Sequence, residues 1–159
     1  MKTASVKELK NELEYLDLKQ LVSITLRLAK FKKENKELLT YLLFEAANEQ
    51  DYVNNVKQLL HIMFTEVNIK NLYFTRKNLR KIVRTSNRYI RYSEEPATEI
   101  ELLIFVCREI GQLEINISKS TVLVNLYNGL IKKIEKAISE LHEDLQYDYS
   151  RDMEKLQLL

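Results

Sequence analysis

The residue types that most often carry catalysis or bind metal ions are scarce in this sequence. Its two histidines are His61 and His142, and its one cysteine is Cys107. Neither histidine belongs to a Glu-x-x-His or His-x-x-x-His pattern, the spacings that place two metal ligands on one face of a helix. His61 stands among apolar neighbours, which indicates a partly buried packing residue. We therefore expect no metal site.

Cys107 offers no better case for nucleophilic chemistry. It ends the apolar run Leu102–Cys107, where a free cysteine behaves as a small hydrophobic residue. Only Arg108 stands nearby in sequence to lower the pKa of the thiol. The chain also has no glycine-rich phosphate loop and no Gly-x-Ser-x-Gly motif. The sequence thus predicts a protein that is not an enzyme and that binds no cofactor.

One segment has a charge pattern typical of anion binding. Between Val67 and Ser93 there is no acidic residue, while arginine and lysine recur. Four of the arginines follow i, i+4 spacing and so line one face of a helix. Tyr73, Phe74, Tyr89 and Tyr92 are interleaved and could stack on bases. The candidate anion- or nucleic-acid-binding residues are Arg76, Lys77, Arg80, Lys81, Arg84, Arg88 and Arg91.

The rest of the chain offers a second explanation for this basic segment. The C-terminal part is acidic, with Glu140 and Asp144 among its carboxylates, and the net charge is only +2. The basic helix could pair with these acids, within the chain or between copies, or could simply be solvated. The small net charge favours that interpretation. The expected function is therefore a non-enzymatic helical interaction module that binds a protein partner or itself, with nucleic-acid or polyanion binding as the alternative.

Composition predicts the fold class. The 159 residues include only 2 glycines and 1 proline, too few for the tight turns of a sheet protein. We expect an all-α fold of six or seven antiparallel helices, in one bundle or a short solenoid-like stack, with more than about two-thirds helix. A single domain over residues 1–159 is expected, with a soft boundary conceivable at 67–74.

Capping signals locate several helices. Ser5 with Glu8 and Asp17 with Gln20 have the form of capping boxes. A turn is expected over 31–36, another over 48–51, and a loop over 67–74. Thr75 is the expected cap of the basic helix, which should continue to about residue 92.

The second half of the chain should hold the core. A helix over about 97–110 is apolar nearly all round, so it is the expected central helix, with Phe105 at its centre and Gly111 as its C′ residue. A last long helix should run from Ser118 or Ser120 to about residue 147, and Gly129 is expected to bend or interrupt it. Its heptad spacing permits a coiled coil, but its wide apolar stripe favours packing into a globular core. From Ser150 the chain is expected to fray or to form one more short helix.

The opening stretch resembles a known kind of helix pair. Residues 6–13 and 18–21 resemble a paired-helix motif of uncharacterised small bacterial helical proteins, which have no assigned activity. The stretch also resembles the SAP motif, a two-helix DNA-binding element, but Tyr15-Leu16-Asp17-Leu18 replaces that motif's glycine-containing, lysine-bearing connection.

The cellular setting is inferred from composition alone. A single cysteine fits a reducing compartment, and the N-terminus has no apolar run typical of a signal peptide. No stretch approaches the roughly 18 apolar residues that span a bilayer. Abundant Lys, Ile and Asn are typical of an AT-rich bacterial genome. We therefore expect a bacterial, cytoplasmic protein without a membrane partner.

Overall fold

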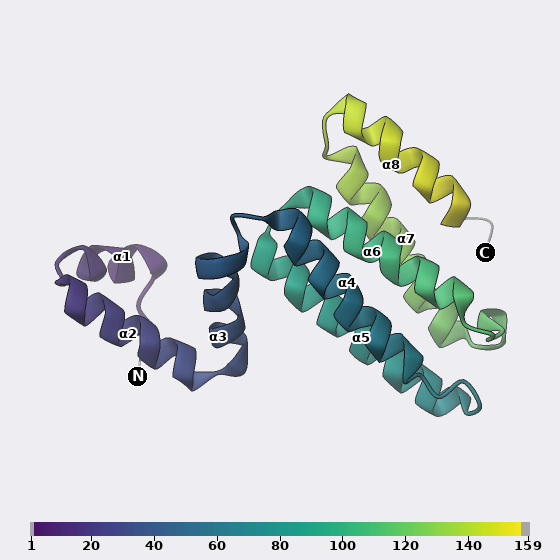
Figure 1. Ribbon diagram of the computed structural model, residues 1–159, viewed down its shortest axis with the longest axis horizontal. Helices are drawn as coiled ribbons and strands as arrows, with labels where there is room; N and C mark the ends of the chain where they lie inside the picture. Colours follow the sequence, from purple (N-terminus) through teal and green to yellow (C-terminus); the bar gives the residue numbers. More distant parts are fainter. Residues whose placement is uncertain (1, 157–159) are drawn as a thin grey trace. The chain divides into compact units, whose positions relative to one another are not determined.

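The computed structural model describes residues 2–156, and within that range all regular structure is helical (Figure 1). Helix accounts for 83% of the structure, which confirms the all-α prediction. The described residues form eight α-helices, more than the six or seven expected: α1 (Val6–Glu14), α2 (Leu18–Phe31), α3 (Lys33–Thr40), α4 (Glu49–Thr65), α5 (Leu72–Ser93), α6 (Pro96–Gln112), α7 (Thr121–Ser139) and α8 (Glu143–Leu156). A π-helical turn, Tyr41–Glu45, follows α3, and a 3₁₀ turn, Ile117–Lys119, precedes α7.

The chain divides into two compact units. The N-terminal unit ends at Phe44 and the C-terminal unit begins at Glu45. The conceivable boundary at 67–74 falls inside the C-terminal unit, over the connection between α4 and α5 and the first residues of α5. The single domain over 1–159 stays a prediction, because two compact units of a chain can belong to one domain.

Both capping boxes of the N-terminal unit are confirmed. The backbone amide of Ser5 donates to Glu8 Oε2 at 2.7 Å, and the Glu8 amide donates back to the Ser5 hydroxyl at 3.3 Å. The Ser5 backbone amide, together with the Ser5 hydroxyl, which also donates to Glu8 Oε2 at 2.7 Å, lowers the pKa of the Glu8 carboxyl. Asp17 and Gln20 form the equivalent box at the start of α2, at 2.8 and 3.1 Å. Both helices therefore begin where the sequence places them.

The turn expected over 31–36 is much shorter. Helix α2 continues to Phe31 and α3 begins at Lys33, so Lys32 alone separates them, in an extended conformation with φ −140° and ψ 146°. The side-chain amide of Asn35 donates to the Leu28 carbonyl at 2.9 Å, and this hydrogen bond connects the first turn of α3 to α2. This contact replaces the loop that the polar composition suggested.

Helix α6 is the centre of the C-terminal unit, as predicted. It packs against α4, α5, α7 and α8. Eight of its residues are buried, and Leu102, Leu103, Val106 and Cys107 are completely so. Phe105, the expected centre, is only half-buried. It lies on the side of the helix that faces the surface, whereas the buried residues lie on the other sides. An ion pair between Lys57 and Glu101, at 2.7 Å, joins α4 to α6. A second ion pair, between Arg108 and Asp152 at 2.8 Å, joins α6 to α8.

Three of the expected helix boundaries are wrong. Helix α4 begins at Glu49 with Asn48 as its cap, so the turn expected over 48–51 is already helical. Helix α5 begins at Leu72, because Asn71 accepts hydrogen bonds from the amides of Tyr73 and Phe74. Thr75 is therefore a buried residue of the first turn, and its hydroxyl donates towards the carbonyls of Asn68 (2.7 Å) and Asn71 (3.0 Å). Gly111 lies within α6, whose C-cap is Leu113.

The last long helix of the prediction is two helices. Ser120 caps α7, which continues through Gly129 without interruption, contrary to expectation. The chain then breaks at Glu140–His142, and α8 runs to Leu156 over the region that was expected to fray or to form one more short helix. The break also divides the heptad pattern, of which Ile134 and Ile138 are buried, and Leu123 and Leu130, which widen the stripe beyond that pattern, are buried as well. The globular-core interpretation of this stripe is thus the one the packing favours.

None of the helices in residues 2–156 is long and apolar enough to cross a membrane.

Candidate functional site

The basic helix α5 is held in place by its apolar face. Leu79, Ile82 and Ile90 are buried on that face, together with small polar residues such as Thr85 and Ser86. The helix packs against α4, α6 and α7. The same 3.6-residue period that buries this face directs the basic residues, which stand between the buried ones in sequence, to the surface.

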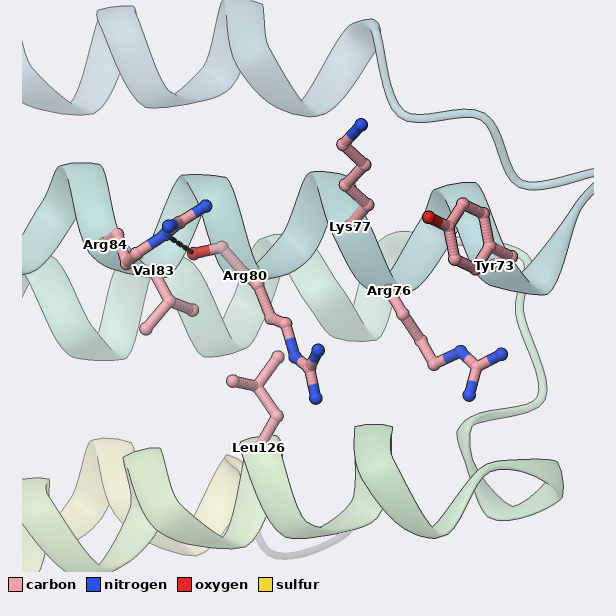
Figure 2. Close-up of a pocket in the computed structure, with 7 residues that line it drawn as sticks. All are labelled: Tyr73, Arg76, Lys77, Arg80, Val83, Arg84 and Leu126. Carbon is pink, nitrogen blue, oxygen red and sulfur yellow. Dashed lines mark hydrogen bonds between the residues drawn. The ribbon is translucent and has the colours of Figure 1, made fainter.

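A groove lies along the exposed side of α5, with a volume of about 590 Å³. It is lined by six residues of α5 and one residue of α7: Tyr73, Arg76, Lys77, Arg80, Val83, Arg84 and Leu126. Figure 2 shows the side chains of Arg76 and Arg80 directed from α5 towards α7, where Leu126 lies, while Lys77 points away from α7. Among residues 2–156, the lining of the groove thus combines four cationic groups with an apolar patch and includes no carboxylate.

Two of the arginines are steadied by their own helix. Arg76 Nε donates to the Leu72 carbonyl at 3.2 Å, and Arg84 Nε donates to the Arg80 carbonyl at 3.4 Å, the dashed line in Figure 2. Each bond uses one of the five N–H donors of a guanidinium group. The terminal nitrogens, which form the fork that binds phosphate, are not used by these two bonds.

These arginines do not pair with the acidic C-terminal region. Within residues 2–156, Arg76, Arg80 and Arg84 form no ion pair. The C-terminal acids have other neighbours: Glu140 lies 3.8 Å from Lys136, Asp144 lies 3.5 Å from His142, and Asp152 lies 2.8 Å from Arg108. For these three arginines, pairing within the chain, one of the alternatives to anion binding, is therefore wrong in the part that the structure describes, which leaves pairing between copies, a solvated surface or anion binding as explanations.

The remaining candidate residues, Lys81, Arg88 and Arg91, do not line the groove. Lys81 is exposed but does not line it. Arg88 is half-buried, and its guanidinium carbon lies 5.4 Å from the centre of the Tyr89 ring. Arg91 lines a different cavity, beside Glu94 and Glu140. The seven predicted residues therefore include four groove residues, namely Arg76, Lys77, Arg80 and Arg84.

The interleaved aromatic residues also divide into two groups. Tyr92 is buried and Tyr89 is half-buried; their rings meet edge to face, and the Tyr52 hydroxyl donates to the Tyr89 carbonyl at 2.8 Å. These two tyrosines are packing residues rather than stacking platforms. Tyr73 and Phe74 are 61% and 45% exposed, with ring centres 5.4 Å apart and an interplanar angle of 77°. Tyr73 alone of the four lines the groove.

The residues first considered for catalysis have ordinary environments. His61 is at the surface rather than packed in the core, with Nδ1 2.9 Å from Glu109 Oε2. Cys107 is completely buried, and burial raises the pKa of its thiol to about 12. In the described part of the chain, no group of three or more His, Cys, Asp or Glu side chains is arranged to hold a metal ion.

Val83 and Leu126 are the groove residues that the sequence did not indicate. Both have the appearance of core residues in their helices, and nothing local distinguishes them from buried neighbours such as Ile82 and Leu123. Only the approach of α7 to α5 brings Leu126 to the wall of the groove.

Comparisons of the chain with protein-family models, with curated proteins and with solved structures gave no significant match, so the groove is interpreted from its own geometry.

Proposed function

We propose that this protein is a non-enzymatic helical binding module whose α5 groove binds phosphate-bearing polyanions. One observation carries the proposal: Arg76, Arg80 and Arg84 share one groove with Lys77 and, within the described residues, have no ion-pair partner. Like charges four residues apart on a helix repel one another, so the arrangement costs folding stability unless an anion neutralises it.

The geometry of the arginines supports phosphate as the bound group. Arginines at i, i+4 and i+8 are spaced about 6 Å apart along a helix axis. Each planar guanidinium group can donate two parallel hydrogen bonds to one phosphate, which a lysine cannot do. A chain of phosphates running along the groove would satisfy several of them together.

The test measures binding as a function of salt. A fluorescein-labelled oligonucleotide is titrated with the full chain at low and at physiological salt, and binding is followed by fluorescence anisotropy. Each phosphate contact to a single strand should contribute a slope of about −0.7 to a plot of log K against log salt. The groove variant, Arg76→Gln with Lys77→Gln, Arg80→Gln and Arg84→Gln, should bind much more weakly and flatten that slope.

A control variant removes the same charge elsewhere. Lys132, Lys136, Arg151 and Lys155 are exposed residues of the C-terminal unit outside the groove. Their replacement by glutamine changes the net charge equally but should retain most of the binding. Equal loss in both variants would show a general charge effect, and no binding at low salt by the unmodified chain would exclude polyanion binding.

A second candidate function, self-association, is favoured by the helices of the N-terminal unit. No residue of α1, α2 or α3 is buried, and Val6, Leu9 and Leu13 form an exposed apolar stripe on α1. The charges that flank the stripe are self-complementary, since Lys7 precedes Glu14 along α1. Two copies of α1 paired antiparallel would bring opposite charges together and cover both stripes.

Sedimentation equilibrium tests this second candidate. The molar mass of the full chain should rise with concentration towards twice 18.9 kDa, while Leu9→Asn with Leu13→Asn should remain monomeric. Leu145→Asn, at an exposed leucine of α8, is the matched control and should associate as the unmodified chain does. A monomer at every concentration would exclude self-association.

A further inference from the structure

We infer that the ligand of the α5 groove is single-stranded nucleic acid, with a base stacked on Tyr73. This inference rests on the proposed function, because it assigns a class of ligand to the same groove. It is supported by three properties of the groove: the burial of α5, the shape of its cationic side, and the position of the exposed Tyr73 ring in its lining.

The burial of α5 argues against a duplex. A helix that reads duplex DNA enters a major groove about 12 Å wide and must therefore project from its domain. Helix α5 has α4, α6 and α7 packed around it, and eight of its residues are buried. It can present one face to a ligand but cannot enter a groove of the ligand.

The shape of the cationic side favours a flexible ligand. Arg76 and Arg80 extend from α5 towards α7, so their guanidinium groups line a hollow rather than a ridge (Figure 2). A duplex is convex and stiff over this length, because its persistence length is about 50 nm. A single strand can bend into the hollow and place successive phosphates on successive arginines, as strands do in the basic channels of single-strand-binding proteins.

Tyr73 provides an aromatic surface on which a base can stack, and a polyanion without bases would not need such a surface. Its ring is 61% exposed and lines the groove one helical turn before Arg76. A base attached to a phosphate on Arg76 can therefore reach the ring. Base–aromatic stacking is sequence-tolerant, because every base has a π face. The apolar side chains of Val83 and Leu126 also line the groove and suit the face of a base better than a sulfated sugar.

The experiment compares three probes on the full chain at one salt concentration. They are a short labelled oligothymidylate, a labelled DNA hairpin duplex of the same number of phosphates, and heparin as competitor. The variants are Tyr73→Ala and Tyr73→Phe, with Tyr147→Ala as the control, because Tyr147 is an exposed tyrosine of α8 outside the groove. Circular dichroism establishes that each variant retains its helix content.

We expect the oligothymidylate to bind more tightly than the duplex. Tyr73→Ala should weaken oligothymidylate binding about 5- to 150-fold, the loss that follows from removing one stacked base. It should leave the heparin affinity unchanged. Tyr73→Phe and Tyr147→Ala should bind as the unmodified chain does. A strand carrying 2-aminopurine should show base-stacking quenching with the unmodified chain that Tyr73→Ala abolishes.

The outcomes separate this inference from the proposed function. If none of the three probes binds at low salt, the proposed function is wrong and the inference falls with it. If duplex and single strand bind equally, or if Tyr73→Ala weakens heparin and oligothymidylate alike, the groove binds polyanions but the assignment to single strands is overturned.

Discussion

Arg76, Arg80 and Arg84 are separated by one helical turn each, and no acid stands between them in sequence. A like-charge pair at this spacing destabilises a helix by about 0.2–0.5 kcal/mol, and the four residues in the groove accumulate that cost. The buried side of α5 offsets it through residues such as Leu79 and Ile82, which are almost inaccessible to solvent. At the scale of the residue, α5 combines strong packing with a charge arrangement that a ligand anion would relieve.

Gly129 is a residue whose replacement should stabilise the protein. It lies in the interior of α7, its φ is negative, and a Cβ built on it meets no atom within 4 Å. Alanine at this position should raise the free energy of unfolding by about 0.5–1 kcal/mol, since glycine loses more backbone entropy in a helix than alanine does. Urea denaturation measures the change; a decrease in stability would show that α7 requires glycine there.

Cys107 should make stability depend on pH in the alkaline range. Its folded pKa is about 12 because of burial, above the ordinary thiol value of 9.0. The folded state therefore keeps a proton that the unfolded state loses, so this contribution is fully present below pH 9 and declines as the pH rises towards 12. Burial also raises the pKa of Tyr127 to about 12, so Tyr127 adds to the decline.

Urea titrations between pH 8 and 11, with Cys107→Ala as the comparison, measure this pH dependence. The variant should be less stable at pH 8, because alanine leaves a cavity, but its stability should fall less between pH 8 and 11. Parallel pH profiles for the two proteins would contradict the assignment to Cys107.

At the scale of elements, α6 organises the C-terminal unit, and its burial is uneven around the circumference. Leu103 is 0% exposed, whereas Phe105, two residues later, is half-buried. This difference follows from 100° of rotation per residue, which carries Phe105 away from the packed side while Leu103, Val106 and Ile110 remain on it. The most apolar segment of the chain is therefore not equally important at every position.

Truncation of these two residues should cost different amounts of stability. Leu103→Ala removes completely buried atoms and should lower the free energy of unfolding by about 2–5 kcal/mol. Phe105→Ala should cost less, although phenylalanine is the larger side chain, because water already reaches part of it. Chemical denaturation of both variants gives the comparison, and a larger loss for Phe105→Ala would mean that α6 packs with its opposite side inwards.

At the scale of the whole molecule, the buried residues are concentrated in the C-terminal unit. Tyr41 is the one buried hydrophobic residue among those described before Glu45, whereas the core from Tyr52 to Leu156 draws on all five helices α4–α8. A unit of about this size can bury a core of its own. In the N-terminal unit, α1 and α2 begin with capping boxes, but α1, α2 and α3 contain no buried residue.

A fragment beginning at Glu45 should therefore fold by itself. We expect it to keep strongly helical circular dichroism, to unfold cooperatively in urea and to bind oligonucleotides with the affinity of the full chain, since the groove lies within it. Circular dichroism, urea titration and the anisotropy assay check these three points. A fragment with non-cooperative unfolding would show that the N-terminal unit contributes to the core.

Much of the local structure follows from the sequence because it depends on residues within one or two helical turns. The caps at Ser5 and Asp17, the helical class, the burial of α6 and the basic face of α5 need only neighbouring side chains and a 3.6-residue period. The errors at Thr75, Gly111 and Gly129 are also local. At each of them a neighbouring residue or continued packing outweighs the propensity of the single residue, as Asn71 does by capping α5.

Which basic residues line the groove depends on the tertiary structure. Seven basic residues on one helix are equivalent in sequence, yet the packing of α5 places Arg91 in a cavity that Glu94 and Glu140 also line, and half-buries Arg88 beside Tyr89. It leaves Arg76, Arg80 and Arg84 without an ion pair to any residue in the range 2–156. The division between α7 and α8 leaves the C-terminal acids beside Lys136, His142 and Arg108. Charge counting cannot predict this outcome, because the Coulomb energy of two groups depends on a separation that only the folded chain fixes.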